Sequence, residues 1–452
     1  MIRAGMDVAR LNTSHGTIAH HIEVCSRVRI AAGAENKPIA VLLDLGGPKL
    51  RTGDLGEGGP VHLAGGSMVH VVSGSGVSAD SRISIDYPSL YDDVSVGDPI
   101  LLDDGAIELT VVEHTGDGLA CRVVFGGTLG AKRGVAMPST RLTLPSITAR
   151  DEEAIKAGVQ MNVDFFAQSF VREAADLTAA RSRINAAGGD VPIVAKIERR
   201  MAIDNLDEVL AEADGAMVAR GDLGVELPPE DVPIQQRNII ASAARHKIPV
   251  ITATQMLESM INSPRPTRAE ASDVANAVWD MSDALMLSGE TAVGRYPVEA
   301  VEMMDRIIRR AESAPGESTP PAPEAGMDDH SYVIALAARR IVESDPNLKA
   351  VVCFTSSGYT AVLMSKVHPA VPIYALSPSE QVVRRLSLAR GVVPFRTRMA
   401  NTADAVFDLV DDTLLEHRVI QPGEEVLVVA GMPVAAAGTT NFVKLHQVGL
   451  SS

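Results

Sequence analysis

Two short apolar runs near the middle of the sequence each end in a carboxylate. The run 193–195 leads into Lys196 and Glu198, and the run 216–219 leads into Asp222. Both runs have the length of buried parallel strands, and residues 201–213 between them follow a helical apolar pattern. The unit is therefore expected to be β-α-β.

Glu198 and Asp222, at the carboxyl ends of adjacent strands, are expected to converge on one point, which is where an α/β barrel carries its chemistry. Two carboxylates suit a hard cation such as Mg²⁺ or Mn²⁺. Lys196 lies two residues before Glu198 and so on the same strand face, where it could neutralise a phosphoryl group. Either cluster alone would favour a buried structural ion pair. Their repetition at consecutive strand ends favours a metal and phosphoryl site.

The elements that must hold these residues alternate between strands and helices. Expected barrel strands begin at Asp7, Pro38, Phe165, Ile193, Ala216, Val250 and Ala284. A closed (β/α)₈ TIM barrel needs eight strands, so one is missing from this count. Because residues 1–5 resemble the last turn of a helix closed by Gly5, we expect the missing first strand to precede Met1. We therefore expect either that the natural start lies further upstream or that the chain as given is insoluble.

Short alternating strands with turn signals interrupt this pattern and predict a small inserted β domain. A Pro/Gly/Ser-rich segment and a further α/β pattern follow the last barrel helix. The expected boundaries are 1–52 and 140–314 for the barrel, 53–139 for the insertion, 315–328 for a linker and 329–452 for a C-terminal α/β regulatory domain.

The composition excludes several classes of protein. The net charge of −16 argues against a nucleic-acid binder, and 3% aromatic residues argue against a base-stacking surface. No apolar run reaches membrane length and no signal peptide is visible. Cys25, Cys121 and Cys353 lack metal-binding spacing and indicate buried thiols in a reducing compartment. We expect a cytoplasmic protein.

A loop in the C-terminal domain joins a strand to a helix start and is rich in hydroxyl groups. Such a loop can cradle a phosphate with its hydroxyls and free N–H groups, although an ordinary helix cap is the alternative. Its residues are Thr355, Ser356, Ser357, Gly358, Tyr359 and Thr360.

Long motifs now resemble the pyruvate kinase family over essentially the whole chain. They are AGMDVARLNTSHG (4–16), LLDLGGPKLRTG (42–53), AKIE (195–198), MVARGDLGVELP (217–228), TATQMLESMINSPRPTRAEASDVANAV (252–278) and LMLSGETAVGRYP (285–297). The resemblance implies a barrel, an inserted lid domain and a regulatory C-terminal domain. It also implies transfer of the phosphoryl group of phosphoenolpyruvate to ADP, giving pyruvate and ATP. A phosphorylated allosteric effector at loop 355–360 and a homotetramer are further implications.

The resemblance assigns the metal to Glu198 and Asp222, and charge stabilisation of the phosphoryl group to Lys196 and Arg10. The Gly221 backbone approaches the substrate carboxylate. Further substrate positions are Asp222, Thr254 on the face where the enolate is protonated through water, and Ser288 and Glu290 around that water. Arg220 is expected to be structural.

The nucleotide positions implied by the resemblance are Asn12, His15, Arg51 and Arg141. Family members commonly carry Lys at the position of Arg141, and His15 has the alternative of a packed loop histidine. The family's K⁺ pocket maps to Asn12, Ser14, Asp44 and the carbonyl of Leu45. K⁺-requiring members have Glu at the position of Lys49 and Thr at that of Leu45. We therefore expect the Lys49 ammonium to substitute for K⁺, the alternative being a solvated surface lysine.

Two other functions compete with this one. An aldolase-type lyase would also use a metal-bound pyruvate enolate in a barrel, but it leaves the β insertion and the loop 355–360 unexplained. A barrel lacking a strand could alternatively retain only a sugar-phosphate-binding C-terminal domain.

Overall fold

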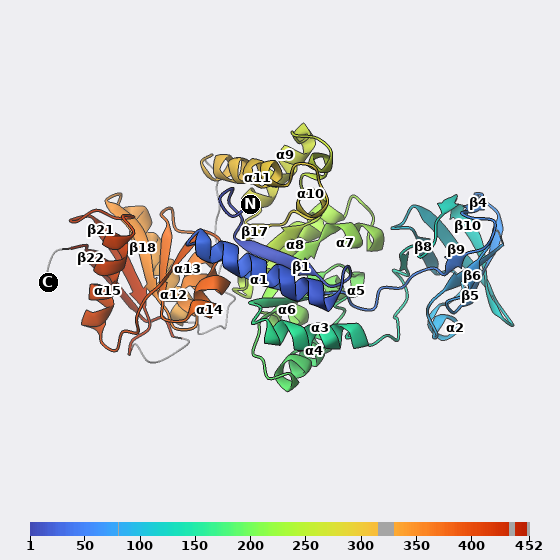
Figure 1. The fold of residues 1–452 in the computed structure, drawn as a ribbon, viewed down its shortest axis with the longest axis horizontal. Coiled ribbons are helices and arrows are strands. Elements are labelled where there is room, and N and C mark those ends of the chain that lie inside the picture. The colour runs from blue at the N-terminus through green and yellow to red at the C-terminus, as the bar shows by residue number, and fades with distance from the viewer. Residues whose placement is uncertain (80, 315–329, 434–438, 450–452) are drawn as a thin grey trace.

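The computed structural model describes the chain except residues 80, 315–329, 434–438 and 450–452. The barrel occupies the middle of the molecule, with the C-terminal domain on one side and the inserted domain on the other (Figure 1). Two chain segments connect the barrel to the inserted domain. The predicted linker 315–328 lies outside the described residues.

The central sheet has seven parallel strands in sequential order, which confirms the predicted α/β barrel pattern. Its strands are β1 (Val8–Asn12), β2 (Ala40–Leu45), β13 (Phe165–Gln168), β14 (Ile193–Ile197), β15 (Gly215–Ala219), β16 (Val250–Ala253) and β17 (Ala284–Leu285). They begin within two residues of the predicted positions. Residues 1–6 form a turn in which the Met6 and Gly5 amides donate to the carbonyls of Met1 and Ile2, as at a helix C-terminus.

Side chains alternate between the two faces of this curled sheet. Ala40, Leu42 and Val194 pack in a cluster inside the curl, and Val41 and Ile193 pack against the helices outside. Because strand side chains have a period of two, Lys196 and Glu198 share the inward face of Val194. The strand pattern thereby points both groups into the top of the barrel.

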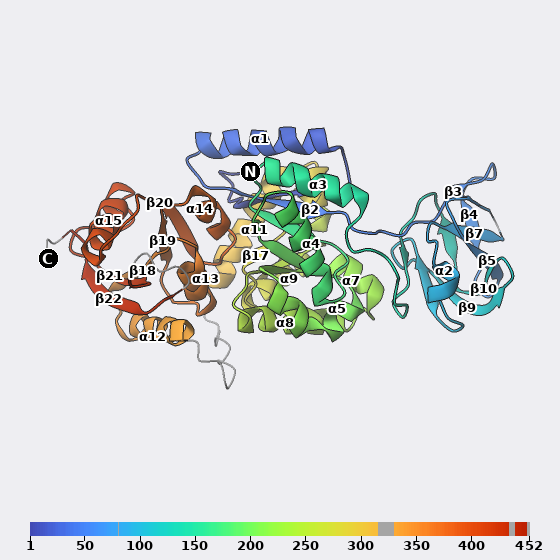
Figure 2. The same cartoon turned by 90° about the horizontal axis from the view of Figure 1, so that it is seen from below.

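Helices cover the outer face of the sheet (Figure 2). They are α1 (Ile18–Ala34), α3 (Ala149–Gln160), α4 (Ala174–Ala186), α5 (Arg200–Asp204), α6 (Leu206–Glu212), α7 (Arg220–Glu226), α8 (Val232–Arg245), α9 (Arg268–Trp279), α10 (Gly289–Ala292) and α11 (Pro297–Glu312), with the 3₁₀ turn η1 (Glu258–Ile261). The single helix expected over 201–213 is wrong. It breaks at Asn205, whose side chain donates 3.1 Å to the carbonyl of Arg172.

The inserted domain is a small β structure around a six-stranded sheet of order β12-β8-β9-β10-β5-β7, with two further strand pairs. Its elements are β3 (Asp54–Leu55), β4 (Val61–Leu63), β5 (Met68–Ser73), β6 (Val77–Ser78), β7 (Arg82–Ile85), α2 (Leu90–Asp93), β8 (Pro99–Leu102), β9 (Ile107–Thr115), β10 (Gly118–Phe125), β11 (Gly127–Leu129) and β12 (Val135–Ala136). A separate apolar cluster fills it, so the insertion has its own core.

The C-terminal domain is a five-stranded sheet of order β20-β19-β18-β21-β22 covered by helices. Its elements are α12 (His330–Ser344), β18 (Leu348–Phe354), α13 (Tyr359–Lys366), β19 (Ile373–Ser377), α14 (Glu380–Leu386), β20 (Val392–Arg396), α15 (Ala403–Glu416), β21 (Glu425–Ala430) and β22 (Phe442–Gln447). Sequence analysis missed β22, which runs antiparallel at the sheet edge. Its sequence, FVKLHQ, lacks the continuous apolar run that marks the buried parallel strands. No helix among the described residues has both the length and the apolar character that a membrane span needs.

Candidate active site

Lys196 is buried at the centre of a charged network at the carboxyl edge of the barrel sheet. Its Nζ lies 2.6 Å from Ser169 Oγ, 3.4 Å from Asp44 Oδ1 and 3.3 Å from Glu198 Oε2. Burial lowers the pKa of Lys196, but the carboxylates of Asp44 and Glu198 outweigh it and hold the pKa above its usual range. The two carboxylates therefore favour the charged form of the ammonium.

Glu198 is almost fully buried, and one of its carboxylate oxygens, Oε2, has no hydrogen-bond partner among the described residues and only an ion pair of 3.3 Å with Lys196. Oε1 accepts a hydrogen bond of 2.5 Å from the Phe170 amide, whereas Oε2 accepts no hydrogen bond from any described residue. Burial raises the pKa of Glu198, the Lys196 charge opposes that shift, and the charge of Asp222 adds to it. A buried carboxylate oxygen that has an ion pair but no hydrogen bond keeps the capacity to bind a further cation.

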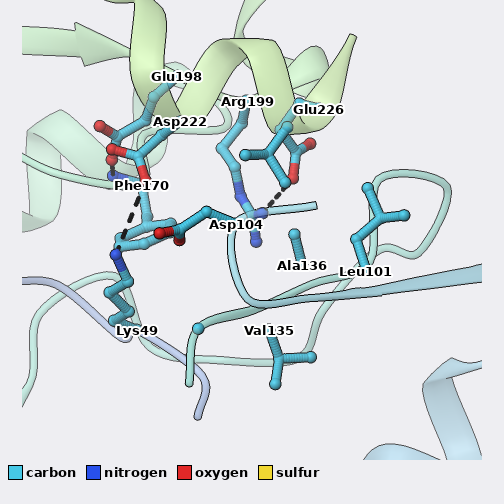
Figure 3. A pocket seen from close by; sticks show the side chains of 12 residues that line it. Lys49, Leu101, Asp104, Val135, Ala136, Phe170, Glu198, Arg199, Asp222 and Glu226 are labelled. Carbon is cyan, nitrogen blue, oxygen red and sulfur yellow. Dashed lines mark hydrogen bonds and ion pairs between the residues drawn. The ribbon is translucent and has the colours of Figure 1, made fainter. Parts of the chain in front are cut away.

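Asp222 lies beside Glu198 in the first turn of the short helix α7, which follows β15 without a loop. Figure 3 shows Glu198, Asp222 and Lys49 around one pocket, which the inserted domain closes with Leu101, Asp104 and residues 134–136. Lys49 Nζ lies 3.9 Å from Asp222 Oδ1.

The two carboxylates fit a divalent cation held partly by other oxygens. No group of three or more His, Cys, Asp or Glu side chains with metal-binding geometry exists among the described residues. Mg²⁺ usually keeps several waters and binds through one or two carboxylates plus substrate oxygens. Glu198 Oε2, which accepts no hydrogen bond from the described residues and lies next to Asp222, matches that preference.

Arg10 lies in the middle of strand β1 and binds Asp44 near the end of the adjacent strand β2. Its Nε and Nη2 donate to Asp44 Oδ2 at 2.7 and 2.6 Å. Since Asp44 is buried and also faces Lys196, the two cations flank one carboxylate. Arg10 and Lys196 are thus brought together, as their assignment to one phosphoryl group requires.

Thr254 and Gly221 face each other across adjacent strand ends. The Gly221 amide donates a hydrogen bond of 2.8 Å to Thr254 Oγ1. The Thr254 hydroxyl in turn donates a hydrogen bond of 2.6 Å to the Ala253 carbonyl. Thr254 has a φ of +69°, which is an outlier for a β-branched residue and occurs where surrounding contacts hold the backbone. Arg220 supplies such contacts, because it donates to the Thr254 carbonyl and pairs with Asp273 at 2.7 Å.

Ser288 and Glu290 lie at the next strand end and have different environments. The Glu290 carboxylate accepts from the amides of Leu257 and Ser288 at 3.1 and 2.7 Å, so it fixes the backbone of two loops. Ser288 Oγ is buried without a hydrogen-bond partner in the described part of the chain. Of the two side chains, Ser288 is the one with free capacity to bind a water.

Two family models and several curated proteins match this chain. A pyruvate kinase barrel-domain model matches residues 1–301 and a pyruvate kinase alpha/beta-domain model matches residues 333–446. The chain belongs to the pyruvate kinase family. It is similar to pyruvate kinases of Geobacillus stearothermophilus (42% identity over 99% of this chain and 77% of the relative) and Mycobacterium intracellulare (41%, 99% and 94%). The Agrobacterium vitis pyruvate kinase is 42% identical over 98% of this chain and 92% of its own length.

Membership of the pyruvate kinase family establishes the chain as a phosphotransferase, and confirms the predicted fold and enzyme class. The family's reaction moves a phosphoryl group between phosphoenolpyruvate and ADP, and its members depend on a divalent metal. The lyase and the binding-only alternatives are thereby set aside.

Each nucleotide position of the pyruvate kinase resemblance has its own local environment. Asn12 Oδ1 accepts 3.0 Å from the Ser14 amide, and His15 is exposed on the same loop. Arg51 donates to the Lys132 carbonyl at 3.0 Å in the inserted domain, and exposed Arg141 lies 3.5 Å from Glu173.

The K⁺ positions of the pyruvate kinase resemblance already have protein partners. Asp44 binds Arg10 and Lys196, and the Leu45 carbonyl accepts 2.7 Å from Ser169 Oγ. The ion pair of Lys49 is with the candidate metal ligand Asp222. Lys49 therefore places its charge at the metal side of the site.

The loop 355–360 uses part of its hydroxyl capacity internally. Thr355 Oγ1 accepts 2.9 Å from the Gly358 amide, and Thr360 Oγ1 lies 2.9 Å from Thr440 Oγ1. Ser356 and Ser357 are the more accessible hydroxyls, although Ser357 Oγ also accepts from the Tyr359 amide at 3.4 Å. Gly358 caps α13 with a φ of +91°, which favours glycine.

Sequence analysis did not identify two neighbours of Lys196 and Glu198. Ser169 follows strand β13 and binds Lys196 directly, so the strand-end rule that found Glu198 could have found it. Phe170 contributes its backbone amide to Glu198 with a φ of +56°. No side-chain pattern signals that contact.

Proposed function

We propose that the carboxyl edge of the barrel sheet transfers the phosphoryl group of phosphoenolpyruvate to ADP, with Glu198 and Asp222 holding Mg²⁺. The observation that supports this most is the buried Oε2 of Glu198. It accepts no hydrogen bond within the described part of the chain, lies beside Asp222 and is 3.3 Å from Lys196 Nζ. Bound there, the ion would supply Lewis-acid stabilisation of substrate oxygens.

Lys196 and Arg10 stabilise the charge of the transferring phosphoryl group. Both are fixed by Asp44, so neither has to reorganise when the substrate binds. Preorganised charge of this kind is the main protein contribution to phosphoryl transfer. The Gly221 backbone beside Thr254 leaves room for the substrate carboxylate.

Thr254 positions the water that protonates the enolate. Its own proton is engaged with the Ala253 carbonyl and its oxygen accepts from Gly221. A hydroxyl is also too weak an acid to act alone near neutral pH. Ser288, with its unpartnered buried Oγ, completes that water site.

The inserted domain, residues 53–139, acts as a lid, and ADP binds beneath it near Asn12, His15, Arg51 and Arg141. The support is the shared pocket lined from both domains together with the family resemblance. The same resemblance supports a homotetramer and a phosphorylated effector at loop 355–360. Sedimentation of the purified protein tests the tetramer.

The test of the proposed function is Lys196→Met in an assay that couples pyruvate formation to lactate dehydrogenase. With phosphoenolpyruvate, ADP and Mg²⁺, the wild type forms pyruvate and ATP in equal amounts. Lys196→Met lowers kcat by at least about a hundredfold with a small change in KM, because its charge matters most in the transition state. An unchanged kcat with a raised KM would restrict Lys196 to binding.

A further inference from the structure

The loop 169–172, which follows β13, supports the segment that leads out to the inserted domain. A Cβ placed on Gly47 would lie 2.8 Å from Phe170 Cδ2 and 3.1 Å from Ser169 Cβ, and Gly47 has a φ of +65°. Only glycine fits so close an approach with that backbone conformation. The outgoing connection therefore rests directly on this loop.

Arg172, at the end of the same loop, holds the segment that returns from the inserted domain. Its Nη1 donates 2.8 Å to the Leu142 carbonyl and its Nη2 donates 3.0 Å to the Leu144 carbonyl. Asp176 in α4 fixes the guanidinium through a 3.0 Å ion pair. The planar fork of arginine can reach two carbonyls at once, which a lysine cannot do in the same way.

The inserted domain forms hydrogen bonds to Thr143, the residue between Leu142 and Leu144. The Thr143 amide donates 2.6 Å to Asp93 Oδ2, and its hydroxyl donates 3.0 Å to Asp93 Oδ1. The Thr143 amide also lies 2.9 Å from the hydroxyl of Tyr87, which is completely buried in the inserted domain. Barrel and inserted domain thus meet on three consecutive residues of the returning segment.

The loop that carries Arg172 also contacts the candidate metal ligand. The Phe170 amide donates to Glu198 Oε1 from a backbone with φ of +56°, which is rare for a bulky residue. Such a conformation persists where the surroundings hold it in place. One short loop therefore touches both connecting segments and Glu198.

We propose that Arg172 is a positioning residue that clamps the returning segment, and so sets where the inserted domain stands over the pocket at Glu198 and Asp222. The proposal rests on the proposed function only in taking that pocket as the active site. Arg172 makes no contact with substrate in this account. It acts through Leu142 and Leu144, and through the backbone that leads to Phe170.

The test compares Arg172→Lys with Arg181→Lys in the full chain. Arg181 makes the same kind of contacts, an ion pair to Asp214 and a bond to the Glu212 carbonyl, but at the opposite end of the barrel strands. Arg172→Lys keeps the positive charge beside Asp176 but loses the planar guanidinium that reaches the Leu142 and Leu144 carbonyls together. We expect the KM for ADP to rise about tenfold and the Thr143 amide to exchange about tenfold faster with D₂O, the effect of one net hydrogen bond. The KM for phosphoenolpyruvate changes less than about twofold.

Thr143→Val tests the contact of the returning segment with the inserted domain. It removes the hydroxyl bond to Asp93 and is expected to raise the KM for ADP, whereas Thr143→Ser behaves as wild type. This pair keeps the proposal testable if Arg172→Lys does not fold. The proposal would be overturned if Arg172→Lys kept the wild-type exchange rate of the Thr143 amide and the wild-type KM for ADP. It would also be overturned if Arg181→Lys changed both quantities as much as Arg172→Lys does. A wild type without turnover would instead refute the proposed function, and hydrogen exchange would still decide on the clamp.

Discussion

Glu198 and Lys196 combine two opposing requirements of a phosphoryl-transfer site at the scale of single residues. The carboxylate keeps one buried oxygen free of hydrogen bonds, and the ammonium is held charged by two carboxylates. Because burial raises the pKa of Glu198, a divalent metal must compete with a proton for that oxygen. Metal affinity is therefore expected to fall as the pH is lowered through the raised pKa.

Lys49 provides a prediction about monovalent cations. Its ammonium pairs with Asp222 at 3.9 Å. A K⁺ ion that came within about 4 Å of this ammonium would be repelled by roughly 4 kcal/mol at an effective dielectric near 20. A K⁺ ion beside this lysine is therefore disfavoured. We predict equal turnover in K⁺ buffer and in tetramethylammonium buffer at matched ionic strength, measured as pyruvate formation.

Lys49→Glu should create a K⁺ requirement, which stays partial because Leu45 is unchanged. Lys132→Glu is the matched control, since Lys132 pairs with Asp54 in the inserted domain away from Asp222, and it should leave turnover independent of K⁺. If the wild type has almost no turnover without K⁺, Lys49 does not substitute for K⁺ and is a solvated surface lysine.

At the scale of elements, sequence periodicity located the strands that carry the site, because a buried parallel strand is a short apolar run. The strand-end rule then found Lys196, Glu198 and Asp222. It could not find the clamp of Arg172 on Leu142, since that contact joins residues 30 apart through a backbone carbonyl. Nor does a sequence pattern encode the positive φ of Phe170 or Thr254, which tertiary contacts impose.

The loop between β18 and α13 gives an element-scale prediction. If Ser356 and Ser357 bind the phosphate of an effector, replacing both with Asp should abolish activation by charge repulsion while basal turnover survives. Turnover with and without a panel of sugar phosphates and AMP measures this. Ser379→Asp at the start of α14, where Ser379 caps the helix, adds a negative charge nearby and should preserve activation. If none of these compounds changes the turnover of the wild type, the assignment of loop 355–360 as an effector site is wrong.

At the scale of the whole molecule, the C-terminal domain docks on the end of the barrel opposite the active site. Leu388 joins the apolar cluster inside the sheet, and Arg384 binds Asp164 just before β13. Lys366 at the end of α13 pairs with Asp283 just before β17, and both side chains are buried. The barrel thus carries the proposed lid at one end and the C-terminal domain at the other.

Lys366→Met should therefore destabilise the chain far more than loss of an exposed pair. Removing one partner of a buried ion pair costs about 3–5 kcal/mol, because Asp283 keeps an uncompensated charge. Lys37→Met, which breaks an exposed pair with Asp7, should cost less than about 1 kcal/mol. Urea unfolding of the two variants measures the difference. Equal midpoints would show that the Lys366 pair adds nothing to docking.

Glu198→Gln tests the central claim most directly, because it removes one charge with almost no change in shape. Mn²⁺ binding to the wild type and the variant is measured by electron paramagnetic resonance, and pyruvate formation is measured alongside. We predict at least about a hundredfold weaker Mn²⁺ binding and roughly a thousandfold lower turnover. Glu226→Gln, which lines the same pocket and can still accept from Arg199, should retain both within about threefold. Mn²⁺ affinity and turnover near wild type in Glu198→Gln would contradict the account.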